Sequence, residues 1–184
     1  DEDFIPTEGT LNWADGDSAD KSFSITLNDD GLYEGNETIS LTLSNPTGGA
    51  LLGTGNTTLT IIDDDPAPRL SFLTTSSMAS ESDGSITISV GRSDNSNGEV
   101  SVNYAVSGGT AKSGSDYYLA AGTLYWTDGD SADKNITVNI VDDSSDEKDE
   151  TVTLTLSEAS GAIVGDNAST TLTIADNDIS SSSI

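Results

Sequence analysis

The chain has 184 residues, with 32 acidic side chains, 6 basic ones, no histidine and no cysteine, which gives a formal net charge of -26 at pH 7. Because no basic surface exists to neutralise phosphates, nucleic acid and anionic membranes are excluded as partners. The absence of cysteine excludes disulfides and cysteine-ligated zinc, and no apolar run reaches the roughly 18 residues of a membrane span. A charge this large opposes compaction unless cations bind in the folded state, and an acidic surface kept for solubility is the alternative.

An internal repeat organises the chain. The sequence GTLNWADGDSADK at 9–21 recurs as GTLYWTDGDSADK at 122–134. Trp126 minus Trp13 gives an offset of 113 residues, and the segments that follow keep nearly the same offset. Two copies of one module are therefore present, and the first copy lacks its front half.

The secondary structure is predicted to be strands throughout, because Val, Ile, Thr, Leu and Ser alternate with period two and no segment has a helical period. The strands expected in the complete copy are 69–74, 85–92, 99–106, 116–119, 122–126 continuing after a turn into 134–141, 150–157 and 170–175. This pattern predicts an all-β fold, a seven-stranded antiparallel immunoglobulin-like β-sandwich.

The domain organisation follows from the repeat. We expect residues 1–66 to hold the last four strands (D to G) of a first repeat and residues 67–178 to form a complete second repeat, with a stiff linker at Pro66-Ala67-Pro68. The serine-rich stretch 179–184 reads as a tail or the start of another linker. The truncated first copy predicts either a parent chain that continues upstream or a neighbouring subunit that supplies the missing strands, which would make a homopolymer.

Acidic residues converge on one end of the predicted sandwich. Six of the ten residues 141–150 are acidic, and they connect two expected strands. If the strands alternate in direction, this loop shares one end with two other connections and with the exit from the last strand. The side chains expected there are Glu81, Asp116, Asp142, Asp143, Asp146, Glu147, Asp149, Glu150, Asp176, Asn177 and Asp178.

Calcium is the ion that this chemistry favours. Ca²⁺ takes six to eight hard oxygen ligands and tolerates irregular loops rich in carboxylates, whereas magnesium prefers fewer carboxylates and transition metals prefer histidine or cysteine. So many carboxylates exceed what one divalent ion needs, and we expect about two to four ions per complete site.

The chain also resembles a known family. The sequences GSDY at 114–117, GTLYW at 122–126, IVDDSSDEKDETVTLTLS at 140–157 and TLTIADND at 171–178 are similar to those of the Calx-β domain. The first copy carries the same signatures, and together they cover nearly the whole chain. The resemblance implies an immunoglobulin-like sandwich of the kind found in the calcium-binding domains of sodium–calcium exchangers and in tandem arrays of secreted bacterial proteins.

The resemblance also implies a ligand set, since calcium-binding members use an early glutamate, the aspartate of the GSDY element, acidic residues of the long loop and a terminal aspartate triplet. In the second copy these positions are Glu81, Asp116, Asp142, Asp143, Glu147, Glu150, Asp176 and Asp178. In the first copy they are Asp3, Asp29, Asp30, Glu34, Glu37, Asp63, Asp64 and Asp65. Two departures stand out. Asn177 replaces the middle aspartate of the second triplet, and the loop that would carry the early glutamate of the first copy is not in this sequence, so that glutamate is either missing or supplied from elsewhere.

Other motifs have simpler interpretations. The DGDSAD sequences at 15–20 and 128–133 lack the glycine and bidentate glutamate of an EF-hand loop, so a polar turn is favoured over a second metal site. Trp13 and Trp126 alternate with their strand neighbours, which favours a core or sheet-face position over sugar stacking. An acidic pair such as Asp142 and Glu147 could serve a glycosidase, but no cleft-forming insertion accompanies it, so no enzyme activity is expected.

The sequence thus predicts a calcium-binding structural or adhesion repeat of an extracellular, cell-surface or secreted bacterial protein or filament. In this hypothesis calcium ions stiffen the junction between neighbouring repeats, and the protein neither binds nucleic acid nor inserts into membranes. The alternative is a carbohydrate-binding or ligand-binding accessory module of a larger secreted protein, which an aromatic platform exposed on one sheet would favour.

Overall fold

The structure, a computed structural model, describes residues 3–179, and the chain divides into two compact units, Asp1–Gly31 and Leu32–Ile184. Apart from Ile179, the serine-rich tail predicted at 179–184 lies outside the described residues. Within those residues, no helix has the length and apolar character that crossing a membrane requires.

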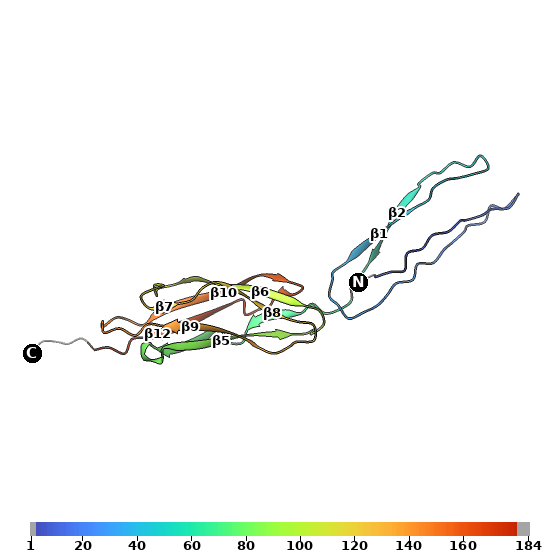
Figure 1. Cartoon of the computed structure of the whole chain (residues 1–184). Helices are drawn as coiled ribbons and strands as arrows, with labels where there is room; N and C mark the ends of the chain where they lie inside the picture. Colours follow the sequence, from blue (N-terminus) through green and yellow to red (C-terminus); the bar gives the residue numbers. More distant parts are fainter. Residues whose placement is uncertain (1–2, 180–184) are drawn as a thin grey trace, which may run out of the picture. The chain divides into compact units, whose positions relative to one another are not determined.

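The larger unit contains a β-sandwich of two five-stranded sheets (Figure 1). One sheet has the order β4-β12-β10-β6-β8 and the other β11-β3-β5-β9-β7. Their bounds are β3 Arg69–Phe72, β4 Ser76–Ser80, β5 Ser85–Ser93, β6 Val100–Gly109, β7 Tyr117–Tyr118, β8 Gly122–Trp126, β9 Lys134–Ile140, β10 Glu150–Ser160, β11 Ile163–Val164 and β12 Ser169–Ala175. A three-residue 3-10 helix, η1 (Glu81–Asp83), joins β4 to β5.

All seven expected strand positions form strands, which confirms the predicted sandwich. The expectation that 122–126 continues into 134–141 as one strand is wrong, because β8 pairs with β6 in one sheet and β9 pairs with β5 in the other. The turn between them carries the chain across the core. The sheets are also not purely antiparallel, since β4 runs parallel to β12 and β11 parallel to β3.

The core lies between the two sheets and is built from the period-two pattern. In β9 the residues Ile136, Val138 and Ile140 are buried while their neighbours are exposed or half-buried, and β10 alternates in the same way. Trp126 closes the core and is 1 % exposed. Full burial of a valine, leucine or isoleucine side chain stabilises the fold by about 1.5–3 kcal/mol. The core fixes the strand register and therefore which loops meet at each end.

The first copy repeats the strand pairing of the second. The antiparallel pair β1 (Glu37–Thr42) and β2 (Asn56–Ile61) aligns Glu37 with Ile61, just as β10 and β12 align Glu150 with Ile174. In the smaller unit an isolated bridge joins Phe4 to Leu27, the counterparts of Tyr117 and Ile140. Of the last four strands expected for this copy, β1 and β2 form. The other two positions are joined by that bridge alone, because no counterpart of β5 borders them among the described residues.

Candidate metal centre

The corner between β4 and β5 positions a buried glutamate. Ser80 accepts a hydrogen bond from Ser82 N and donates its own N–H to Asp83 Oδ2 at 2.8 Å, which caps η1. Gly84 then ends this turn in the left-handed region, with φ of 70°. The result is that Glu81 is held in place and only 8 % exposed. The Ser-x-x-Asp pattern of a capping box could have located this corner from the sequence.

Two other connections are tied to the same end of the sandwich. Asp116 Oδ2 accepts a hydrogen bond from Lys112 N at 2.5 Å, and the Asp116 carbonyl accepts one from Val141 N at 3.0 Å. Ile140 N donates to the carbonyl of Gly84 at 2.9 Å. The β4–β5 corner, the β6–β7 connection and the start of the β9–β10 loop therefore meet, as strand alternation predicted.

Two groups of carboxylates form at this meeting point. In each group, one carboxylate oxygen from every residue lies within 4.8 Å of the others. The first group consists of Glu81, Asp176 and Asp178. The second group is made by Asp116, Glu147 and Glu150. Six of the eight residues predicted for the second copy are thus brought together in two clusters. We refer to them as the Glu81 cluster and the Asp116 cluster.

The terminal triplet is fastened to the β9–β10 loop by Asp176. Its Oδ2 accepts a hydrogen bond from Glu147 N at 3.0 Å, and its Oδ1 accepts one from Asp178 N at 3.0 Å. Asp176 belongs to the Glu81 cluster and Glu147 to the Asp116 cluster, so this hydrogen bond connects the two clusters.

The remaining two predicted residues lie on the same loop but outside both clusters. Asp142 Oδ1 accepts a hydrogen bond from Asn177 Nδ2 at 3.3 Å. Asp143 Oδ1 accepts one from Ser145 N at 2.7 Å, and such hydrogen bonds keep the pKa of Asp143 below its usual value. Both carboxylates are exposed.

The electrostatics of this end disfavour ionisation of its inner carboxylates. Burial, followed by the charges of Asp176 and Asp143, raises the pKa of Glu81 to about 7. The pKa of Asp178 is raised by burial and then by the charge of Asp176. A hydrogen bond with Asp116, and then burial, raise the pKa of Glu150. Like charges gathered with little counter-charge have this effect, and a bound cation would reverse it.

The polar atoms of the Glu81 cluster fit a hard cation. Glu81 Oε2 and Asp178 Oδ2 are buried and have no hydrogen-bond partner. A buried carboxylate oxygen without a partner is costly, whereas a metal ion would satisfy it. All the available donors are oxygens, which matches calcium ligation and excludes a zinc site built on nitrogen or sulfur.

The first copy contains the same fastening. Asp63 Oδ2 accepts hydrogen bonds from Glu34 N at 2.9 Å and Gly35 N at 2.6 Å, while Asp63 Oδ1 accepts one from Asp65 N at 3.0 Å. Hydrogen bonds from Asp65 and Gly35 lower the pKa of Asp63. Asn36 Oδ1 adds a contact that the sequence did not predict, accepting from Asp63 N at 3.1 Å.

The other first-copy candidates are placed as follows. Glu37 begins β1, and Asp64 is exposed between the two other aspartates of its triplet. Asp3, Asp29 and Asp30 belong to the smaller unit. There the Asp3 carbonyl accepts a hydrogen bond from Asn28 N at 2.8 Å, the counterpart of the contact between Asp116 and Val141.

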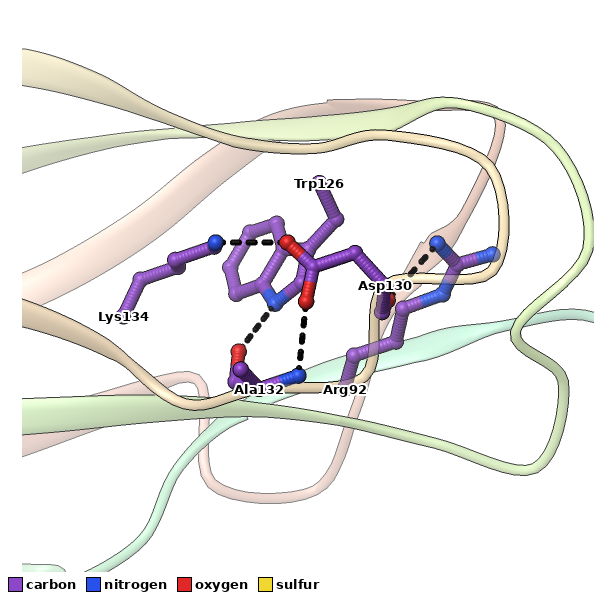
Figure 2. A network of polar contacts seen from close by, with 5 residues as sticks. All are labelled: Arg92, Trp126, Asp130, Ala132 and Lys134. Carbon is purple, nitrogen blue, oxygen red and sulfur yellow. Dashed lines mark hydrogen bonds and ion pairs between the residues drawn. The ribbon is translucent and has the colours of Figure 1, made fainter.

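The DGDSAD turn at 128–133 joins β8 to the start of β9, at the end of the sandwich opposite the acidic clusters. Its residues form a hydrogen-bonded network (Figure 2). Trp126 Nε1 donates to the Ala132 carbonyl at 2.7 Å, and Asp130 accepts from Ala132 N at 2.8 Å and from Lys134 Nζ at 2.6 Å. The Asp130 carboxylate is thus engaged by protein donors, which agrees with the predicted polar turn.

The two tryptophans differ in burial. Trp126 is in the core as predicted, whereas Trp13 is 51 % exposed although it keeps the same contact, a 2.8 Å hydrogen bond to the Ala19 carbonyl. Of the two positions predicted for the tryptophans, core or sheet face, the exposure of Trp13 rules out the core.

Comparison with known families decides the classification. The sequence model of the Calx-beta domain matches residues 1–65 and again residues 63–178. This chain belongs to the Calx-beta family. The match confirms the resemblance drawn from the motifs, and the two matched segments agree with a tandem repeat.

The curated relatives of this Calx-beta chain include sodium/calcium exchangers. The Drosophila melanogaster exchanger Calx is 32 % identical over 148 residues, which cover 80 % of this chain and 15 % of the exchanger. Sodium/calcium exchanger 2 of Homo sapiens is 33 % identical over 163 residues, covering 79 % of this chain and 18 % of that protein. The chain thus spans less than a fifth of the length of these relatives.

Solved structures agree with the fold of this Calx-beta chain. The apo-form CBD1 domain of Calx superposes with a TM-score of 0.58 at 25 % identity, covering 61 % of this chain and all of that domain. The calcium-binding domain CBD12 of CALX1.1 gives a TM-score of 0.57 at 26 % identity and covers 60 % of this chain and 45 % of that one.

Proposed function

We propose that this chain binds calcium ions at the acidic end of each repeat and that the ions stabilise the folded state. The observation that carries the proposal is the buried Glu81 Oε2, which has no hydrogen-bond partner and lies in a cluster with Asp176 and Asp178. The relatives support it, since they include sodium/calcium exchangers and one similar solved structure is that of a calcium-binding domain. A bound cation supplies positive charge that neutralises the carboxylates.

In the second repeat, the Glu81 cluster would hold one ion and the Asp116 cluster another, with Asp143 at the outer edge. In the first repeat, the ligands that we propose in the larger unit are Glu34, Glu37, Asp63, Asp64 and Asp65. Those that we propose in the smaller unit are Asp3, Asp29 and Asp30. No catalytic step is part of this function, since we propose that the carboxylates act as ligands only.

We further propose that calcium stiffens the junction between the repeats. The first repeat's fastening at Asp63 stands just before the linker, and the Pro66 carbonyl accepts a hydrogen bond from Asn95 Nδ2 at 3.2 Å. The Asn95 loop is itself held by the buried Arg92, whose Nε donates to the Asn95 carbonyl at 2.9 Å and whose Nη2 donates to the Asn97 carbonyl at 2.6 Å. The linker after Asp65 is therefore already attached to the second repeat through Pro66. Calcium that ordered the acidic loop of the first repeat would fix the other end of this linker.

The biological setting that we propose is an extracellular repeat of a bacterial surface protein, adhesin or filament. Tandem repetition and the net charge of -26 support a solvated array. The exchanger relatives favour a second setting, a calcium-responsive segment of a larger transport protein. The carbohydrate-binding alternative gains less support, because the exposed Tyr118 and Tyr125 lie on β7 and β8, which belong to different sheets and form no common platform.

We also propose that a neighbouring repeat covers the open side of the first copy, through strands equivalent to β3–β6. Leu59 in β2 is 38 % exposed, whereas its counterpart Leu172 is fully buried. Strand complementation between chains would provide such cover and give a homopolymer. Sedimentation measures this directly, and a folded monomer with Leu59 and Trp13 solvent-accessible would contradict it.

Thermal unfolding of chelator-treated protein tests the function. Calcium should raise the unfolding temperature far more than an equal concentration of magnesium, because magnesium prefers fewer carboxylate ligands. A ligand present at 100 times its Kd stabilises the native state by about 2.7 kcal/mol. Glu81→Gln should reduce this shift, while Asp166→Asn, an exposed site in the β11–β12 turn, should leave it unchanged. Equal shifts with both metals, or no shift, would show that the acidic end is only solvated charge.

A further inference from the structure

Asn177 differs chemically from its neighbours in the terminal triplet. It stands between Asp176 and Asp178, two members of the Glu81 cluster, at the position where the first repeat has Asp64. An amide carries no charge but can donate a hydrogen bond, which a carboxylate cannot. Asn177 Nδ2 donates to Asp142 Oδ1 at 3.3 Å.

We propose that Asn177 limits the calcium capacity of the second repeat by holding Asp142 in an internal hydrogen bond. This inference rests on the proposed calcium binding. It concerns Asp142 alone among the eight predicted ligands, because the other seven are free of this contact and six of them form the two clusters.

The site beside Asn177 calls for a ligand on independent grounds. Glu81 is 8 % exposed, and its Oε2 is buried without a hydrogen-bond partner. Asp178 Oδ2 is in the same condition. Asn177 would therefore affect how many ions bind at this end, and not whether an ion binds there.

Asp142 lies within electrostatic reach of the Glu81 cluster but does not belong to it. Its charge contributes to the field that raises the pKa of Asp178, after burial and Asp176. Its Oδ1, however, is shared with the Asn177 amide, which competes with a cation for the same oxygen. With Asp at position 177 the donor disappears, Asp142 is released, and a new carboxylate joins it. Two acidic side chains at the outer edge would then provide the oxygens for a further ion.

Equilibrium dialysis of the full chain with radioactive calcium tests the inference. Asn177→Asp should bind one ion more per chain than the wild type at saturating calcium. Asn177→Ala removes the hydrogen bond without adding charge and should not weaken binding. Asn135→Asp is the matched control, because Asn135 is exposed at the far end of β9 and its Oδ1 accepts from Ser89 Oγ, which an aspartate can also do. It should bind as many ions as the wild type.

The outcomes distinguish a failure of the proposed role of Asn177 from a failure of the proposed calcium binding. An unchanged ion count in Asn177→Asp, or an affinity loss of about tenfold or more in Asn177→Ala, would overturn the inference, the latter because it would make the Asn177 amide oxygen a ligand. Wild-type protein that binds no calcium would overturn the proposed function itself. Circular dichroism of each variant in chelator establishes that it is folded before the ions are counted.

Discussion

Asp176 accepts a hydrogen bond from the backbone N–H of Glu147 at 3.0 Å, across 29 positions of sequence. The pair joins the exit of the last strand to the long acidic loop, and Asp63 makes the same contact with Glu34 in the first repeat at 2.9 Å. Because both repeats have this hydrogen bond, the attachment of the acidic loop to the last strand is a regular structural feature of the repeat and not a chance cluster of surface charge.

The contact predicts a difference between two substitutions of Asp176. Asn at this position can still accept from Glu147 N but removes the charge, so Asp176→Asn should keep the loop attached while weakening calcium binding by about tenfold or more. Asp176→Ala loses both properties and should also increase amide hydrogen exchange at Glu147. Calcium titration and hydrogen exchange on the two variants measure this. Equal exchange rates in both would show that the hydrogen bond does not hold the loop.

Stability without calcium should fall as the pH rises. The pKa of Glu81 is raised from 4.5 to about 7, so this group contributes stability that is fully present below about pH 4.5 and is lost as the pH rises through 7. Glu150 and Asp178 have raised pKa values and act in the same direction. Unfolding temperatures in chelator at pH 5 and pH 8 test this, and Glu81→Gln should flatten the profile. If the unfolding temperature in chelator rose from pH 5 to pH 8, the pKa values of Glu81, Glu150 and Asp178 could not be raised in the folded state.

The repeat supplies a matched pair for the core. Leu172 is fully buried, and Leu172→Ala should destabilise the sandwich by about 2–5 kcal/mol through lost burial and a residual cavity. Leu59 occupies the same position in the first repeat but is 38 % exposed, so Leu59→Ala should cost far less. Urea unfolding of both variants provides the comparison. A large loss in Leu59→Ala would indicate that the first repeat is covered in solution.

Arg92 should matter for the fold but not for the ions of its own repeat. It is buried, donates to three backbone carbonyls, and lies at the end of the sandwich away from the acidic clusters. Arg92→Met should therefore destabilise the repeat by about 3 kcal/mol. The calcium-induced rise in unfolding temperature should persist in this variant. Its loss would mean that the two ends of the sandwich are coupled.

The strands and their meeting loops were predictable because they depend on period-two alternation and on strand parity alone. Alternation in β9 and β10 identified the core positions, and parity brought Glu81, Asp116 and Asp178 to one end. The repeat offset added the first-copy counterparts. These features depend on residue type and spacing, which the sequence contains.

Other features depend on how the chain passes between the sheets. The SSMAS segment of β4 has a weak apolar pattern, and only its parallel pairing with β12 makes it a strand. The separation of β8 from β9 arises because the turn crosses the core, which alternation cannot reveal. The contact of Asn177 with Asp142 depends on side-chain geometry at the end of the sandwich, whereas the sequence showed only the replaced aspartate.

The most direct measurement is a crystal structure of the chain grown with millimolar calcium, with anomalous differences recorded to identify the ion. Calcium binding at this end predicts an anomalous peak at about 2.3–2.6 Å from carboxylate oxygens of Glu81, Asp176 and Asp178, with a second peak at the Asp116 cluster. An ordered acidic end without any such peak in the presence of calcium would show that these carboxylates are not a calcium site.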